Sequence, residues 1–331
     1  MTNGNDGPVA ATAASVADDV LAGGATTVAI AVADPRHPLV DLVRGSGSAR
    51  PVLDVGSVTK VVVTAALHRR LGIDPDAPVR RWFPGLPHEV RVGDLLTHRA
   101  GLRAWWPLYL TGGRDRESSL AVAAGLPLRH AAGGARVYSD LGYVLAGAVA
   151  ELVHDAPLDR LARDHVFGPL GMADSGYRPD SLCVPTSLGD RIERRMVQTG
   201  VPHPVDDAVR AAATTFPWRT HRLAGEVNDG NCWHAFGGVA GHAGLFTTAA
   251  DLVAFGRELL DHVRSGGDPI GYWPTPGRLE HPGFPGARFA VLPRADRVVV
   301  LLSNRLFGAG DPPDLTEPWR RLVDTVEKEA R

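Results

Sequence analysis

The sequence predicts an α+β fold, in which helices flank an antiparallel sheet built from both termini and a mostly helical domain lies beside it. Two observations predict this fold. Apolar runs of strand length occur near both ends of the 331-residue chain, and the region between them carries mainly helical patterns. We therefore expect a sheet domain formed by residues 1–63 and 231–331, and a helical insertion domain formed by residues 64–230.

The N-terminal part begins with an alanine-rich segment, residues 9–21, that is compatible with a helix. Residues 26–34, TTVAIAVAD, alternate apolar side chains as a strand does, and the PRHP turn follows them. Residues 39–45, LVDLVRG, are the expected hairpin partner of that strand.

The central region carries two clear helical patterns. Residues 141–152 repeat apolar side chains at helical spacing, with Ser139 or Asp140 as the expected N-cap. Residues 251–263 do the same, with Thr247 or Thr248 as cap. Residues 178–231 and 265–285 are rich in Gly, Pro and polar residues, and this composition predicts long irregular segments.

The C-terminal part predicts a second hairpin and a last helix. The hairpin strands are ARFAVLP and residues 297–304, RVVVLLSN, joined by RAD. The run 298–302 is continuously apolar, which is typical of a central strand buried on both faces. Residues 315–329 are amphipathic and predict a helix.

Charge and composition argue against several functional classes. The formal net charge is −2 and the pI about 6.7, so neither nucleic acid nor an anionic membrane is an expected partner. The N-terminal residues show no signal-peptide pattern, and we expect a cytoplasmic protein. The only cysteines, Cys183 and Cys232, are expected to be free thiols. No metal-ligand spacing occurs in the sequence, and no cofactor is expected.

Lys60 is one of only two lysines, with Lys328, among 35 Lys and Arg residues. Arginine cannot be deprotonated in a protein, whereas lysine can lose its proton where the surroundings disfavour its charge. Lys60 follows Ser57 by three residues, the S-x-x-K arrangement of an activated serine nucleophile. If residues 57–64 are helical, Ser57 stands at the helix N-terminus with Lys60 on the same face. Residues 61–64 are β-branched, so a strand is the alternative secondary structure for this segment. The alternative to a catalytic role is a purely structural one, in which Ser57 caps a helix and the Lys60 side chain extends to solvent.

Two further segments offer groups for the same chemistry. Tyr138 precedes the predicted helix at 141–152; it is either part of a helix cap or a phenol that exchanges a proton with Lys60. The segment 280–292, EHPGFPGARFAVL, is either a turn into the hairpin or a strand edge with one free N–H facing an oxyanion.

Taken in order, these segments resemble the penicillin-recognising serine hydrolase superfamily, specifically its class C beta-lactamase-like and esterase branch. LDVGSVTKVV is similar to the nucleophile motif and YSDLGYVLAGAVAELV to the Tyr-x-Asn/Asp motif. VRVGDLLTHRAGL, HVFGPLGMADSGY and GGVAGHAGLFTTAADLVAFGRELL are similar to further landmarks of the branch. The resemblance implies a beta-lactamase/DD-peptidase-like fold with the active site in the cleft between the two domains.

The resemblance also implies roles for single residues. Ser57 would be the nucleophile that forms an acyl-enzyme, and Lys60 and Tyr138 the proton-transfer pair. Asp140 would be a polar neighbour that contacts Lys60 or substrate. Backbone N–H groups of Ser57 and Phe284 would form the oxyanion hole.

The chain departs from the superfamily in its third motif, usually Lys-Thr/Ser-Gly and here His281-Pro282-Gly283. A histidine that titrates near neutrality would hold a substrate carboxylate less firmly than a fixed cation does. Pro282 removes a hydroxyl and a strand N–H. Asp140 stands where Asn is usual, favours the ammonium form of Lys60 and makes Tyr138 the expected base.

The expected function is therefore that of a serine esterase or acyltransferase working through an acyl-Ser57. Its partners would be a small ester or activated acyl donor and water or a small acceptor. Trp218 and Trp233 either line an acceptor pocket or pack in the core. The alternatives are a D-amino-acid peptidase or amidase, a beta-lactamase, and a ligand-binding relative without catalysis. The sequence predicts no oligomeric state.

Overall fold

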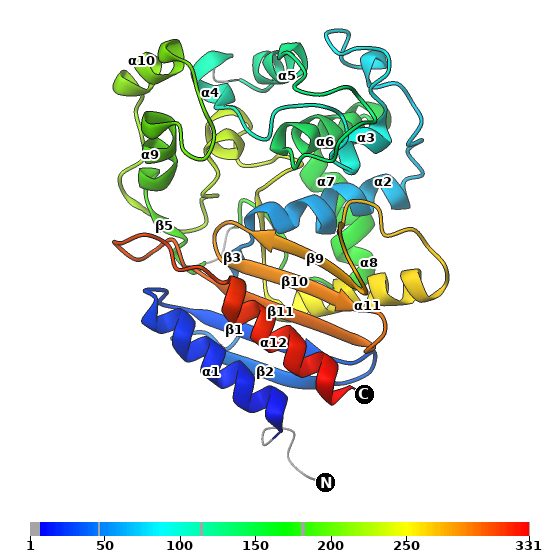
Figure 1. Cartoon of the computed structure of the whole chain (residues 1–331), viewed down its shortest axis with the longest axis vertical. Helices are drawn as coiled ribbons and strands as arrows, with labels where there is room; N and C mark the ends of the chain where they lie inside the picture. Colours follow the sequence, from blue (N-terminus) through cyan, green and yellow to red (C-terminus); the bar gives the residue numbers. More distant parts are fainter. Residues whose placement is uncertain (1–6, 46, 113–114, 180–182, 331) are drawn as a thin grey trace.

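The computed structural model describes residues 7–45, 47–112, 115–179 and 183–330. Its centre is a six-stranded antiparallel sheet with the strand order β2-β1-β11-β10-β9-β8 (Figure 1). Strands from the two ends of the chain meet where Val28 of β1 pairs with Ser303 of β11. This pairing confirms the predicted sheet built from both termini. The strands are β1 Val28–Ala33, β2 Pro38–Arg44, β8 Trp273–Thr275, β9 Arg278–Gly283, β10 Ala287–Leu292 and β11 Arg297–Ser303.

Helices cover both faces of this sheet. α1 (Pro8–Ala22) and α12 (Thr316–Glu329) lie side by side across one face, blue and red in Figure 1. A hydrogen bond from Val9 N to Glu329 Oε2, 3.2 Å long, joins them. α11 (Ala249–Arg264) packs on the other face. Because side chains alternate along a strand, neighbouring residues enter different cores: Ile30 packs with α1 and α12, and Ala31 with the opposite core.

Most of the other helices lie above the sheet in Figure 1. α6 (Asp140–His154) is buried along residues 141–150 and begins at Ser139, whose side chain accepts a hydrogen bond from Gly142 N. Both this cap and the Thr248 cap of α11 were among the predicted alternatives. Further helical segments are α2 Ala66–Arg70, α3 Val92–Leu96, α4 Leu108–Thr111, α5 Arg116–Gly125, α7 Leu158–Ala162, α8 Gly168–Leu170, η3 Val79–Arg81, η4 Arg163–Phe167 and η5 Asn231–Ala235.

The prediction of long irregular segments was wrong in two places. Residues 178–231 contain α9 (Arg191–Thr199) and α10 (Asp207–Thr215), and the short strands β5 (Ser187–Leu188) and β6 (Arg222–Leu223) pair with each other. Composition hid α9 because the helix is mostly polar: its apolar residues Ile192, Met196 and Val197 share one face, but Val197 is the only residue of α9 that is fully buried. Residues 265–285 contain the whole of β8 and β9. Residues 1–6 and 180–182 lie outside the described part of the chain.

A small three-stranded sheet, order β3-β7-β4, leads to the candidate site. β3 (Leu53–Asp54) ends three residues before Ser57, and β7 (Leu245–Thr247) pairs with both β3 and β4 (Gly176–Tyr177). Both cysteines are buried thiols, as predicted. Within the described ranges, no helix has the length and apolarity that a membrane span requires. The predicted domain boundaries stay a prediction.

Candidate active site

Ser57 lies at the start of a buried helical segment, so the helical alternative for residues 57–64 is the one the structure adopts. A 3-10 turn, η1 (Gly56–Val58), passes into the π-helical η2 (Lys60–Ala65) and then into α2. Gly56 has a φ of 50°, and a Cβ there would lie 2.5 Å from Pro285 Cδ. Glycine is therefore required at the turn that presents Ser57.

Lys60 is completely buried and reaches the Ser57 hydroxyl. Its Nζ lies 2.7 Å from Ser57 Oγ, 3.1 Å from the His242 carbonyl oxygen and 2.7 Å from Asp140 Oδ1. Burial lowers the pKa of Lys60, but the Asp140 carboxylate and Tyr138 outweigh burial and raise it above the ordinary value. Lys60 is an ammonium at neutral pH, as the sequence predicted from Asp140.

Tyr138 completes a three-membered group at the N-terminus of α6. Lys60 Nζ lies 5.0 Å from the Tyr138 ring centroid, and the phenol makes side-chain hydrogen bonds with Lys60 and Ser57. Burial raises the pKa of Tyr138; Lys60 lowers it and Asp140 raises it, and the balance is a raised pKa. The predicted base, Tyr138, is thus a protonated phenol in the free protein. The structure brings together Ser57, Lys60, Tyr138 and Asp140.

Gly283 and Phe284 lie beside the Ser57 turn. A Cβ on Gly283 would collide with the Val55 carbonyl oxygen, and the Cβ position on Gly56 is 3.4 Å from Phe284 N. The Gly283 carbonyl accepts a hydrogen bond from Gly286 N at 3.1 Å. Since C=O and N–H point in opposite directions in a trans peptide, the Phe284 N–H faces away from that bond, and Phe284 N lies beside the Ser57 turn. This geometry suits an oxyanion hole made by the backbone of residues 57 and 284.

His281 does not behave as the sequence predicted. It is 3% exposed, and its Nδ1 lies 2.9 Å from the Pro282 carbonyl oxygen. Burial first, and then the charge of Lys60, lower its pKa to about 3. His281 is therefore neutral near pH 7 and supplies no cation, contrary to the expectation of titration near neutrality. β8 pairs with β9 only as far as Glu280, so His281 and Gly283 stand beyond that pairing in the described strands.

Asp229 and His242, which the sequence analysis did not single out, are linked to Lys60 by hydrogen bonds. Asp229 Oδ1 lies 2.9 Å from His242 Nε2, and the His242 carbonyl accepts the hydrogen bond from Lys60. The Asn228 N–H donates to Asp54 Oδ2 at 2.8 Å, and Asp54 Oδ1 accepts from Gly56 N at 2.9 Å. Residues 228–229 thus connect to the chain on both sides of Ser57. No short-range spacing signals this, because the contacts exist only in the folded chain.

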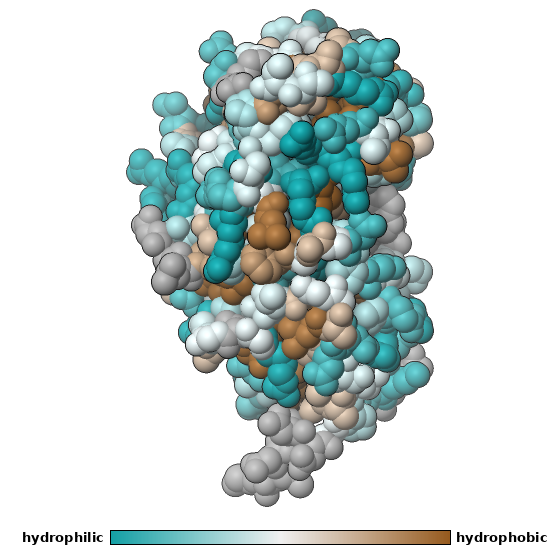
Figure 2. Space-filling model, turned by 90° about the vertical axis from the view of Figure 1, so that its left-hand side faces the viewer, coloured by the Kyte–Doolittle hydropathy of each residue, from teal (hydrophilic) through white to brown (hydrophobic). Residues whose placement is uncertain are grey.

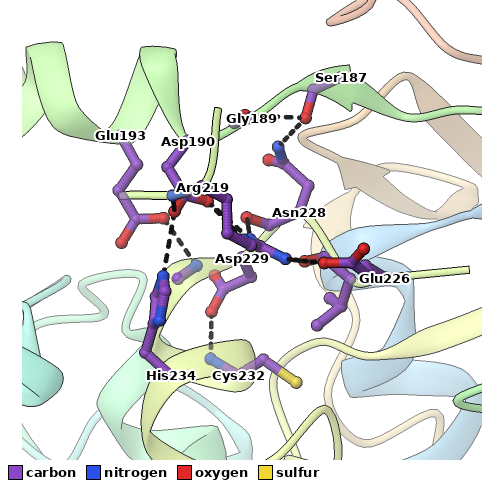
Figure 3. Close-up of polar contacts among 12 residues, drawn as sticks. Ser187, Gly189, Asp190, Glu193, Arg219, Glu226, Asn228, Asp229, Cys232 and His234 are labelled. Carbon is purple, nitrogen blue, oxygen red and sulfur yellow. Dashed lines mark hydrogen bonds and ion pairs between the residues drawn. The ribbon is translucent and has the colours of Figure 1, made fainter. Parts of the chain in front are cut away.

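Arg219 is hydrogen-bonded to the backbone of residues 227–228, next to Asp229 (Figure 3). It is 8% exposed, pairs with Asp190 at 2.7 Å and donates to the Val227 carbonyl oxygen at 3.0 Å and the Asn228 carbonyl oxygen at 3.2 Å. Of the two tryptophans left open by the sequence, Trp218 donates to the Ala213 carbonyl oxygen and Trp233 lies under Arg219. Both are partly buried and pack against the main core.

Comparison with known proteins relates nearly the whole chain to one family. The family model described as Beta-lactamase matches residues 12–322. The "Putative D-alanyl-D-alanine carboxypeptidase" of Escherichia coli K12 is 28% identical over 236 residues, which are 63% of this chain and 50% of that protein. This chain spans about half the length of the curated relatives it matches.

Two solved structures have a similar fold. EstCE1, a hydrolase with promiscuous acyltransferase activity, is 17% identical with a TM-score of 0.66, covering 96% of this chain and 98% of that one. The D-amino acid amidase of Ochrobactrum anthropi is 18% identical with a TM-score of 0.61, covering 98% and 100%. At such identity the similarity establishes the fold, and a substrate does not follow from it.

Proposed function

The chain belongs to the beta-lactamase family, and on this premise we propose that it is a serine hydrolase that acts as an esterase or acyltransferase on small, uncharged acyl donors. Ser57 is the nucleophile, and Lys60 with Tyr138 exchanges its proton. The partners are an acyl donor and either water or a small acceptor.

The reaction needs a pair that can take up a proton. With Lys60 an ammonium and Tyr138 a phenol, the pair is fully protonated at rest. The active form is the pair that has lost one of these two protons, and its share grows as the pH rises. Ser57 Oγ then attacks the acyl carbonyl while its proton passes to the pair, and the leaving alcohol departs with that proton. Water or an acceptor repeats the steps on acyl-Ser57, with the backbone N–H groups of Ser57 and Phe284 bonding the oxyanion.

The neutral His281 is the observation that carries the choice of substrate. A beta-lactam or a D-alanyl-D-alanine peptide carries a carboxylate, and the position where the superfamily usually has lysine offers it no cation. Phe284, 48% exposed, adds apolar surface next to the oxyanion position. Figure 2 shows that one face of the molecule carries apolar side chains at mid-height and again lower down, among polar ones. The neutral His281 and the exposed Phe284 favour an ester with an apolar acyl group.

A D-amino-acid amidase is the second candidate, and one observation favours it. Asp140 keeps 17% of its side chain exposed while it pairs with Lys60. A carboxylate at the mouth of the site would attract the ammonium group of an amino-acid amide. The D-amino acid amidase of Ochrobactrum anthropi shares the fold.

A substrate panel separates these candidates. We expect turnover of p-nitrophenyl butyrate that is lost in Ser57→Ala, more product with an added alcohol acceptor if acyl transfer occurs, and little turnover of nitrocefin. Preferred turnover of D-phenylalanine amide would move the assignment to an amidase. If a fluorophosphonate does not label Ser57 in the folded protein, the remaining hypothesis is a ligand-binding relative without catalytic activity.

A further inference from the structure

His98, in the turn after α3, is held in an unusual conformation. It is 3% exposed, and its φ is 59°, a left-handed value that is uncommon for residues other than glycine. Such a conformation costs free energy and persists only when the surrounding structure holds it. The contacts of His98 show what this conformation achieves.

Three contacts from His98 converge on Tyr138 and its two neighbours. The imidazole stacks on the phenol ring, with centroids 4.6 Å apart and planes 29° apart. His98 Nδ1 accepts a hydrogen bond from Ser139 N at 3.0 Å, and the His98 carbonyl accepts one from Val137 N at 2.9 Å. The ring of Tyr138 and the peptides on both sides of it are thus held by one residue.

The imidazole is suited to this place because it is neutral. Burial first, and then the charge of Lys60, lower the pKa of His98 to about 2. A neutral imidazole can accept through Nδ1, as the bond from Ser139 requires. It also adds no positive charge beside Lys60.

We propose that His98 is a positioning residue for Tyr138, which keeps the phenol hydroxyl within hydrogen-bonding reach of Ser57 and Lys60. This inference rests on the role that the proposed function gives to Tyr138. His98 itself exchanges no proton in the reaction. A misplacement of about 1 Å in a reacting group costs on the order of 100-fold in rate.

Two substitutions of His98 separate the effect of the stacked ring from the effect of the Nδ1 hydrogen-bond acceptor. His98→Asn keeps an acceptor near the position of Nδ1 and tolerates the left-handed backbone, but removes the stacked ring. His98→Phe keeps a ring and removes the acceptor. We expect each to lower kcat on p-nitrophenyl butyrate by about 10- to 100-fold with little change in KM, because substrate contacts are unaltered.

His68→Asn is the matched control. His68 is another buried histidine, with Nε2 2.8 Å from the Ala146 carbonyl oxygen and a pKa lowered to about 4 by burial. It lies on α2, away from Tyr138 in every contact described for it. We expect this variant to lose stability but to keep its kcat.

A double-mutant cycle with Tyr138→Phe decides whether His98 acts through Tyr138. We expect His98→Asn to cause no further loss of kcat in the Tyr138→Phe background. If Tyr138→Phe alone keeps the wild-type kcat, the proposed role of Tyr138 fails. The positioning role is wrong, and the proposed function stands, in either of two cases in which Tyr138→Phe is impaired. In the first, a folded His98 variant has the wild-type kcat. In the second, the losses of kcat in the two single variants multiply in the double variant. Circular dichroism identifies which variants fold, and whichever His98 variant folds provides the test.

Discussion

Asp140 Oδ1 lies 2.7 Å from Lys60 Nζ, and Asp140 is also the first residue of α6. The fully buried ammonium is therefore neutralised by a carboxylate at a helix N-terminus, directly after the Tyr138-Ser139 dipeptide. The pair ties the helix that carries Lys60 to the helix that follows Tyr138. Its charge balance sets the protonation state from which Ser57 must be activated.

Asp140→Asn should move the ascending limb of the kcat/KM profile to lower pH. Asp140 raises the pKa of both Lys60 and Tyr138, so its removal lowers both and the pair loses its first proton at lower pH. The plateau should fall, because Lys60 loses the ion pair that orients it. A pH series with p-nitrophenyl butyrate measures both effects. Asp261→Asn, an exposed change on α11, is the control. A limb that stays in place in Asp140→Asn would contradict the assigned proton pair.

His281 should stay neutral across the range from pH 5 to pH 9. Burial and the charge of Lys60 lower its pKa to about 3, so its proton is lost well below that range. Accordingly, His281→Asn should leave the ascending limb of the kcat/KM profile in place. NMR of the ring carbons measures the titration directly. A ring that titrates near pH 6.5 would contradict this prediction, because His281 would then be positively charged in part of this pH range.

Gly283→Ala should impair acyl transfer. The added methyl group would collide with the Val55 carbonyl oxygen and move β9, with Phe284 N, away from Ser57. Loss of one oxyanion donor costs about 3 kcal/mol, or about 100-fold in kcat. Gly125→Ala is the control, since a Cβ there meets no atom within 4 Å. The idea is wrong if a folded Gly283→Ala protein acylates Ser57 at the wild-type rate.

Arg219→Met should destabilise the protein by about 3–5 kcal/mol, because it removes the arginine that pairs with the buried Asp190 carboxylate and leaves His234 as the side-chain partner of that carboxylate. Urea unfolding measures this change. Arg195→Met breaks an exposed pair with Asp311 and should cost about 1 kcal/mol or less. Equal losses of unfolding free energy in the two variants would show that the buried Arg219–Asp190 pair contributes no more to stability than an exposed pair does.

Local patterns predicted much of the fold and the first part of the site. Strand alternation placed β1 and β2, helical spacing and capping residues placed α6 and α11, and the spacing of Ser57 and Lys60 indicated a shared helix face. These features depend on residues that are close in sequence. α9 escaped prediction because most of its residues are polar and only Val197 is fully buried.

Properties that arise from burial and long-range contact could not be predicted. The neutrality of His281 depends on the protein around β9, which no neighbouring residue signals. Asp229 reaches Lys60 through His242, two segments far from Lys60 along the chain. The pKa of Tyr138 depends on burial against the opposing charges of Lys60 and Asp140, a balance that only the folded structure sets.

Intact-mass spectrometry after fluorophosphonate treatment tests most directly whether Ser57 is a nucleophile activated by the proton-exchanging pair of Lys60 and Tyr138. The wild type should gain one adduct that maps to Ser57, and Ser57→Ala should gain none. Lys60→Arg keeps the positive charge but cannot give up a proton, so its labelling should slow by about 100-fold or more. An adduct on Ser57→Ala, or Lys60→Arg labelled at the wild-type rate, would contradict the assignment.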